Sequence, residues 1–281
     1  MIARLQEDYS VKRLCAVLDC PRSSYYYQSR PGEQDELLAE IEAVLMRWPF
    51  YGYRRVLQEL HRRGWAEVGE RVVRRLLRQL EHSCAVGRVK VSTTDSSHPH
   101  WRYPNRIKGW KATYPDQVWV ADITFIRFGR RFIYLAVILD AFTRAVRGWA
   151  LSGSLDQQLT LDALEMALEN GVPFIFHSDQ GSPYTTGQHT QRLAELGVKI
   201  SMSDTGQPTQ NGLVERFIRT LKEEHVDYAE YADFVDAYRQ LKQWLEVEYM
   251  TERIHSALSY LTPAAFEVMA LAELYPPLIS P

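Results

Sequence analysis

The 281-residue chain has 46% hydrophobic and 24% charged residues, a composition that excludes a disordered or fibrous protein. No apolar run reaches membrane-spanning length and the N-terminal residues lack the order of a secretory signal, so we expect a cytoplasmic protein with no membrane partner. Cys15, Cys20 and Cys84 show no paired spacing, so the sequence indicates neither a disulfide framework nor a zinc site.

Charge is distributed unevenly along the chain, although the net charge is only −2. Residues 1–110 hold 19 basic and 13 acidic residues, a net of +6, whereas the remainder holds 14 and 22, a net of −8. A basic first part favours a polyanionic partner, and an acidic second part favours a metal or no charged ligand at all.

Residues 1–91 are predicted to form a small helical region. Residues 10–28 have the pattern of two short helices around a turn, which is helix-turn-helix-like, although a helical hairpin without a ligand fits this stretch equally well. The spacing of apolar residues predicts three further helices at about 33–47, 54–63 and 71–80.

The basic excess is concentrated between Arg47 and Lys90, where there are 11 basic residues and only four acidic ones, with tryptophans and tyrosines interleaved. This composition is typical of a surface that meets phosphates and bases, so the region is predicted to bind DNA. A solvated helix face is the competing interpretation. The candidate DNA-binding residues here are Arg54, Arg55, Arg74 and Arg75.

A domain boundary is predicted after the helical region. Residues 92–112 begin as a polar linker and continue as a basic, aromatic arm. Residues 113–226 form the predicted core, and residues 227–281 a C-terminal helix and tail that pack on it.

The core begins with strands. Three β-rich runs, 117–128, 131–141 and 144–152, are joined by short turns and predict an antiparallel meander. Helices and strands then alternate, so we predict an α/β fold, a mixed sheet with flanking helices. The later elements are expected as helices at 156–170, 188–196, 211–225 and 234–249, and as strands at 173–179 and 198–203.

Acidic residues interrupt this apolar pattern. Asp122 lies within "DQVWVADITFI", a strand whose two faces are both apolar, so the site must supply a cation, hydrogen bonds or a proton. Asp179 ends the strand "PFIFHSD", where active-site groups of α/β sheets gather, and Glu215 follows on a helix with 35 residues between them. Two strand-borne aspartates and a helix-borne glutamate can converge and hold two Mg²⁺ ions.

The motifs around these acids occur in a fixed order: "WVADIT", "VILDAFTRAVRGWAL", "FHSDQGSPYTT", "SMSDTGQPTQNGLVERFIRTLKEE" and "RIHSALSYLTPAAFE". This series resembles the catalytic core of bacterial insertion-sequence transposases, and more narrowly the second-frame, OrfB-type product of elements whose two reading frames are joined by frameshifting. The resemblance covers about residues 101–267. Residues 34–82, with "YGYRRV", resemble the helical DNA-binding region that precedes that core.

The resemblance implies an RNase H-like, retroviral-integrase fold with Asp122, Asp179 and Glu215 as catalytic residues. They would bind two Mg²⁺ (or Mn²⁺) ions for cleavage of element ends and strand transfer by two-metal phosphoryl transfer. The implied partners are double-stranded DNA of the element ends and target, and an upstream-frame helix-turn-helix protein fused by frameshifting. A homo-oligomer is expected, because joining two DNA ends needs two active sites. The family's Tyr-Asn pair is Tyr249-Met250 here, and no zinc module precedes the core.

Two other functions use the same features. A ribonuclease acting on RNA–DNA hybrids would share the fold and metals, but it would need neither the basic helical region nor the motifs after Glu215. A catalytically silent, transposase-derived DNA-binding regulator is the non-enzyme alternative, and an intact acidic triad argues against it.

Further polar residues near the triad have open roles. Arg219 and Lys222 share a helix face with Glu215, and they either bind DNA phosphates or form a surface ion pair with Glu215. Asp140, four residues before Arg144, favours a turn or ion-pair role. His177 is as consistent with a hydrogen-bonded core histidine as with a group that approaches the metals.

Overall fold

The computed structural model describes residues 10–17, 31–82, 103–185, 187–204 and 207–274. The chain forms two compact units, Met1–Cys84 and Ala85–Pro281. The second predicted helix within residues 10–28 lies outside the described residues, as does the 92–102 part of the predicted arm. The domain boundaries predicted from sequence stay predictions.

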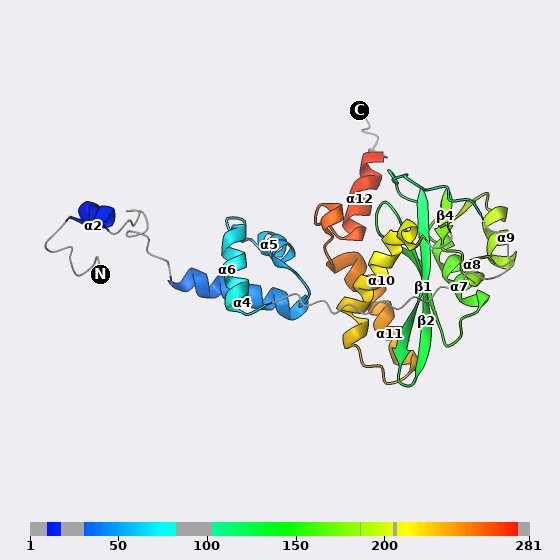
Figure 1. The fold of residues 1–281 in the computed structure, drawn as a ribbon, viewed down its shortest axis with the longest axis horizontal. Coiled ribbons are helices and arrows are strands. Elements are labelled where there is room, and N and C mark those ends of the chain that lie inside the picture. Colours follow the sequence, from blue (N-terminus) through cyan, green and yellow to red (C-terminus); the bar gives the residue numbers. More distant parts are fainter. Residues whose placement is uncertain (1–9, 18–30, 83–102, 186, 205–206, 275–281) are drawn as a thin grey trace, which may run out of the picture. The chain divides into compact units, whose positions relative to one another are not determined.

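The described residues of the first unit are helical, as predicted (Figure 1). Val56 and Leu60 of α5 and Val73 and Leu76 of α6 are fully buried, because the apolar residues of each helix recur at three- and four-residue intervals. The helices of this unit are α2 (Val11–Val17), α4 (Pro31–Arg47), α5 (Tyr53–Arg62) and α6 (Glu70–Gln79).

The second unit is built on a five-stranded mixed sheet with the strand order β3-β2-β1-β4-β5. The first three strands pair antiparallel, and β4 and β5 continue the sheet parallel to β1. Gly129, with a φ of +58°, lies in the two-residue turn that joins β1 to β2, where a left-handed residue suits a tight hairpin. The strands are β1 (Val118–Phe128), β2 (Arg131–Asp140), β3 (Val146–Ser152), β4 (Ile175–Ser178) and β5 (Lys199–Met202).

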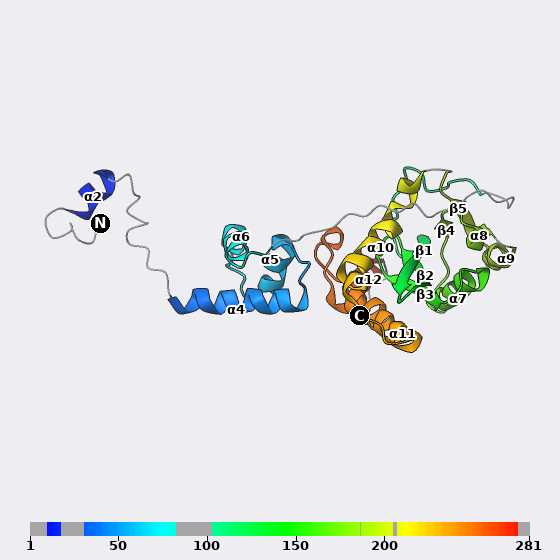
Figure 2. The same cartoon turned by 60° about the horizontal axis from the view of Figure 1, so that its bottom comes forward.

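Helices cover both faces of this sheet, which is why neither face of β1 is solvated (Figure 2). Val118 and Val120 belong to the core beneath the helices α10 and α11, whereas Trp119 and Ala121 belong to the core beneath α7 and α9. The α/β mixed sheet with flanking helices is therefore confirmed. These helices are α7 (Gln157–Leu168), α9 (Gly187–Glu195), α10 (Gly212–Glu224) and α11 (Phe234–Lys242).

The remaining elements connect and extend this frame. The predicted long helix near the C-terminus starts as α11 and continues with π-type winding over Gln243–Glu252. Within the described residues, no helix combines the length and apolar character needed to cross a bilayer. The shorter elements are α8 (Ser182–Thr185), 3₁₀ turns at Pro208–Asn211, Val226–Tyr228 and Ser256–Leu258, and the last helix, α12 (Pro263–Leu274).

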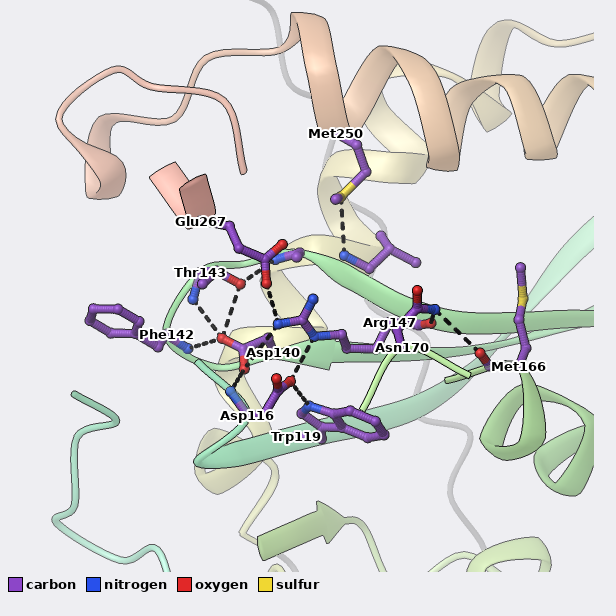
Figure 3. A network of polar contacts seen from close by, with 12 residues as sticks. Asp116, Trp119, Asp140, Phe142, Thr143, Arg147, Met166, Asn170, Met250 and Glu267 are labelled. Atoms are coloured by element: carbon purple, nitrogen blue, oxygen red, sulfur yellow. Dashed lines mark hydrogen bonds and ion pairs between the residues drawn. The ribbon is translucent and has the colours of Figure 1, made fainter. Parts of the chain in front are cut away.

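A buried ionic network fixes α12 to the sheet (Figure 3). The side chain of Arg147, only 8% exposed, forms ion pairs with Asp116 (2.9 Å), with Asp140 (3.9 Å) and with Glu267 of α12. The turn role expected for Asp140 is confirmed, because its Oδ1 accepts the backbone N–H of Thr143 at 2.6 Å. Its ion-pair partner within 4 Å is Arg147 rather than Arg144, because β3 carries Arg147 back beside the end of β2.

Candidate active site

The parallel pairing of β1 with β4 sets Asp122 and Asp179 at the same level of the sheet. Val120 pairs with His177, and each aspartate lies two residues further along its strand direction. Because side chains alternate along a strand, Asp122 lies on the sheet face of Val120, which is the face that α10 covers. Asp179 comes directly after the last residue of β4, Ser178.

Helix α10 brings Glu215 to this face. Its predicted apolar stripe is confirmed, because Val214, Phe217, Ile218 and Leu221 are all buried in the core above the sheet. Asn211, directly before the helix, donates from Nδ2 to the carbonyl of Ala121 at 3.0 Å. The start of α10 is thereby fastened one residue before Asp122, and Glu215 lies half-buried in the first helical turn.

The electrostatics of the three carboxyl groups indicate that they lie near one another. Burial, together with the charges of Asp179 and Glu215, raises the pKa of Asp122 to about 8, although the N–H of Ile123 and the Lys222 ammonium oppose this shift. Burial also raises the pKa of Glu215; Arg219 lowers this pKa and Asp179 raises it. An excess of negative charge therefore gathers where a strand, a strand end and a helix start meet.

The loop after β4 orients Asp179. Its Oδ1 accepts the N–H of Gly181 at 2.9 Å, and a Cβ on residue 181 would lie only 2.9 Å from that same oxygen. Helix α8 begins at the next residue, Ser182, and its Tyr184 is 2% exposed. The Tyr184 hydroxyl has no hydrogen-bond partner in the described part of the chain. Burial raises the pKa of this hydroxyl, and the charges of Asp122 and Asp179 raise it further.

Tyr184 and Asn211 are site residues that the sequence analysis did not single out. Both lie in the quoted motifs, "FHSDQGSPYTT" and "TQNGLVERF", but neither carries a charge that marks it in an apolar pattern. His177, by contrast, has a structural role. Its two ring nitrogens lie 2.9 Å from the Ser201 hydroxyl and 3.1 Å from the Ser203 hydroxyl, and burial lowers its pKa to about 4.

The donor chemistry of the three acids suits a hard divalent cation. Carboxylate oxygens are the ligands that Mg²⁺ and Mn²⁺ prefer, and a cation would offset the crowding that raises the pKa of Asp122. No group of three or more His, Cys, Asp or Glu side chains is arranged to hold a metal ion within the residues described above. The acids thus converge without forming a closed coordination shell.

The two basic residues of α10 that share the face of Glu215, Arg219 and Lys222, lie differently around the acids. Lys222 has its Nζ 5.0 Å from the ring centroid of Phe125. Burial lowers the pKa of Lys222, and the negative charges of Asp227 and Asp122 partly oppose this shift. Arg219 is exposed, and in the described region no ion pair within 4 Å joins it to Glu215. A close Glu215–Arg219 surface pair, the alternative to a phosphate-binding role, is therefore not formed.

The arginines predicted to bind DNA lie on the first unit, and two of them lie over the ring of Tyr53. The guanidinium carbons of Arg54 and Arg74 lie 5.3 Å and 4.7 Å from this ring centroid. Arg55 lies 5.2 Å from the ring centroid of Tyr51, and Arg75 is exposed. The exposed face of α6 also contains two arginines that the sequence analysis did not list, so the complete set on that helix is Arg71, Arg74, Arg75 and Arg78.

Comparison with known protein families separates the same two units. Residues 112–208 and 196–263 match integrase core domains, and residues 33–90 match an HTH-like domain. In solved structures, the HTLV-2 integrase catalytic core domain in complex with magnesium is 18% identical, with a TM-score of 0.44, and covers 56% of this chain and 99% of that one.

Curated relatives are matched along nearly their whole length. The transposase for insertion sequence element IS904 of Lactococcus lactis is 33% identical over 85% of this chain and 97% of its own. The transposase for IS629 of Shigella sonnei is 30% identical over 95% of this chain and 94% of its own. With the acids gathered on an integrase-core sheet and relatives of this identity along almost the entire chain, the protein belongs to the transposases of bacterial insertion sequences.

Proposed function

We propose that this transposase cleaves the ends of its insertion sequence and joins them to target DNA by metal-dependent phosphoryl transfer at Asp122, Asp179 and Glu215. The observation that carries the proposal is the meeting of the three acids: β1 and β4 bring two of them to one level, and α10 brings the third to the same face. Their mutual effects on pKa support this proximity.

The three carboxylates would hold two Mg²⁺ or Mn²⁺ ions. Bound there, the ions would activate water or a DNA 3′-hydroxyl and stabilise the leaving 3′-oxygen of an in-line displacement. The protein's own contribution is positioning: Asn211 fastens the start of α10 to β1, and Gly181 fixes the Asp179 carboxylate. Lys222 and Arg219 would contact the phosphates that flank the scissile bond.

Duplex DNA is the proposed partner of the first unit. The residues proposed to contact its phosphates are Arg54, Arg55, Arg74 and Arg75, with Arg71 and Arg78 on the same exposed face of α6. An arginine-rich helix in an HTH-like region fits the major groove and its phosphates. We further propose that the chain acts as a homo-oligomer, because two DNA ends require two active sites, and that an upstream-frame helix-turn-helix protein is joined to it by frameshifting.

The direct test is Asp122→Asn in the full chain, assayed with Mg²⁺ on a duplex that carries the terminal repeat of its element. We expect loss of both strand cleavage and strand transfer with unchanged DNA affinity, because the change removes a ligand charge and keeps the side-chain shape. Asp162→Asn is a matched control, since Asp162 is exposed on α7 and bonds only to Gln158 among the interactions described.

The outcomes separate the alternatives. Transfer by Asp122→Asn at the wild-type level contradicts the assignment of the triad. Binding of the duplex without cleavage by the wild-type chain, with either Mg²⁺ or Mn²⁺, indicates a silent regulator. Cleavage confined to an RNA–DNA hybrid, offered in the same assay, indicates a ribonuclease.

A further inference from the structure

A cavity of about 510 Å³ opens beside the start of α10, within the second unit. It lies between the segment 105–112, the first half of β1 and the turn between β2 and β3. Its volume falls within the roughly 300–1,000 Å³ that small-ligand sites occupy. The polar, aromatic and helix-start residues of its lining include Lys108, Trp110, Lys111, Arg144, Asn211 and Gly212.

The part of the lining formed by the start of α10 is suited to an anion. Helix α10 begins there, and Asn211 at its N-cap position makes no side-chain hydrogen bond to the first turn. The N–H groups of a first helical turn lack partners inside the helix and attract negative charge. Arg144 lines the same cavity, and its Nη1 is buried with no hydrogen-bond partner in the described part of the chain.

Unsatisfied polar atoms are a further feature of this lining. Asn211 is 4% exposed, yet its Oδ1 is also without a partner in the regions that the structure describes. Buried polar groups in native proteins are nearly always hydrogen-bonded, so these two lining residues each keep an unused hydrogen-bonding group beside the cavity. The backbone of Arg144 is held in place, because its carbonyl accepts the Tyr249 hydroxyl at 3.0 Å.

The lining of the cavity also offers an aromatic surface. Trp110 is 48% exposed although it lines the cavity, and it lies between two lysines in sequence. Lys108 forms an exposed ion pair with Asp204 at 3.5 Å, whereas Lys111 has no ion pair within the described residues. A wide aromatic ring beside cations is the arrangement with which proteins bind single nucleic-acid bases and their phosphates.

The cavity adjoins the acids. Val118 and Val120 line it, and Asp122 lies two residues beyond Val120 on the same face of β1, a separation of about 7 Å at the usual strand rise. A DNA strand whose scissile phosphate lies at Asp122 therefore reaches the cavity within one or two nucleotides.

We propose that this cavity binds one unpaired nucleotide of the DNA strand next to the scissile bond, with its phosphate at the start of α10 and Arg144, and its base stacked on Trp110. The inference rests on the proposed function for the identity of the polymer. An unpaired nucleotide is required because the faces of a base inside a duplex are already covered by its neighbours, so only an unstacked base can lie against the indole.

The test compares two DNA ligands on the full chain. A fluorescein-labelled blunt duplex and the same duplex with a three-nucleotide single-stranded extension, both of arbitrary sequence, are titrated in EDTA and followed by anisotropy. Contacts of the duplex with the first unit contribute equally to both ligands, so the ratio of the two dissociation constants reports the extension alone. We expect wild-type protein to favour the extended duplex by roughly tenfold, since stacking of one base contributes about 1–3 kcal/mol.

Variants assign this preference to the cavity. Trp110→Ala should reduce the ratio to about one, and Trp110→Phe should retain most of it, because a phenyl ring still stacks. Phe234→Ala, which removes an exposed aromatic side chain of α11 outside the cavity lining, is the matched control and should leave the ratio unchanged. The salt slope is the steepness with which the logarithm of the binding constant falls as the logarithm of the salt concentration rises. Lys111→Ala should lower this slope for the extended duplex by about 0.7, the effect of losing one single-strand phosphate contact.

Two results would overturn the proposal. One is an equal affinity of wild-type protein for blunt and extended duplexes, and the other is a preference that survives in Trp110→Ala. Neither result depends on metal or cleavage. If the protein favours the extended duplex but never cleaves DNA, the cavity assignment stands and the proposed function is wrong. If it cleaves DNA but shows no preference for the extension, only the cavity assignment is wrong.

Discussion

Burial determines the protonation of the ionisable side chains around the sheet. Burial and neighbouring carboxylates raise the pKa of Asp122 to about 8, so without a nearby cation its carboxyl group is mostly protonated at neutral pH. Burial has the opposite effect on imidazoles and lowers the pKa of His177, of His189 and of His225 to about 4. These histidines are therefore neutral core residues at physiological pH.

His189 provides a test of this effect away from the acids. Its ring packs edge-on against Phe176, with centroids 5.2 Å apart, and neither nitrogen has a hydrogen-bond partner among the described residues. The unfolded chain binds a proton at about pH 6.5 and the folded chain only near pH 4, so stability present above pH 6.5 is lost as the pH falls.

His189→Leu should remove this pH dependence. Between pH 6.5 and pH 5 we expect the free energy of unfolding of the wild-type protein to fall by about 2 kcal/mol more than that of the variant, at about 1.4 kcal/mol per pH unit. Urea unfolding at both pH values measures the difference. Parallel pH profiles of the two proteins would show that His189 is protonated in the fold or partnered by solvent.

At the scale of secondary-structure elements, a glycine of β3, Gly148, lies directly against the backbone of α7. A Cβ on Gly148 would lie 2.2 Å from the carbonyl oxygen of Ala163 and 2.6 Å from the backbone nitrogen of Ala167, both within α7. The obstructing atoms are backbone, so no side-chain rotation can relieve the clash. The helix therefore packs on the sheet at this distance only because residue 148 has no side chain.

Gly148→Ala should accordingly destabilise the protein by about 3 kcal/mol, the upper part of the range for overpacking a well-packed interior. Gly153→Ala is the matched control, because a Cβ there meets nothing within 4 Å and its φ is not in the left-handed region. Thermal unfolding of the two variants compares them directly. Equal melting temperatures would mean that α7 can move away from β3 without loss.

Helix α10 serves two purposes with two faces. One face supplies the buried stripe, and the neighbouring face carries Glu215, Arg219 and Lys222. On the latter face, Lys222 is close enough to Asp122 for the two charges to affect each other's pKa. The Lys222 ammonium also lies over the Phe125 ring. The helix thus couples sheet packing to the charge balance of the candidate active site.

Lys222→Ala should weaken binding of terminal duplex DNA and reduce the salt slope by about 1, with little change in melting temperature. Adding Arg219→Ala should increase the effect. Lys242→Ala on α11 is the control, since its ammonium lies 3.9 Å from the Glu246 carboxylate and away from the acids. A double variant with wild-type salt dependence and transfer rate would exclude phosphate binding by this face.

At the scale of the whole molecule, the two units carry different candidate functional residues. The first has an arginine-rich helical surface without the acidic residues of the site, and the second holds the acids on a sheet. Glu267 and Arg147 join the last helix to the same sheet, so the second unit includes almost all of the described C-terminal chain (Figure 3).

This division predicts that DNA affinity and chemistry can be altered separately. In the full chain, Arg54→Ala with Arg74→Ala should reduce the salt slope of duplex binding by about 2, because each arginine neutralises about one phosphate. The melting temperature should change little, because both side chains are exposed. Arg192→Ala is a suitable control, as this arginine pairs with Glu165 at 2.7 Å in the other unit. Unchanged salt dependence in the double variant would make the arginine surface structural only.

The fold class, the order of the main elements and the three candidate acids could all be predicted from the sequence. Periodicity distinguishes strands from helices because it records which side chains are buried in each element. An aspartate within an apolar strand, such as Asp122, is conspicuous for the same reason. The motif series then pointed to the transposase family that the relatives establish.

Which polar groups contact one another became clear only from the arrangement of the elements in space. Sequence spacing suggested Arg144 for Asp140, but the β2–β3 hairpin brings Arg147 there. The bond from Asn211 to Ala121 spans 90 residues, and the cavity at Trp110 is formed by segments equally far apart. Local patterns report only whether a residue is buried, whereas its partner depends on how strands register and helices pack, and no short stretch of sequence contains that information.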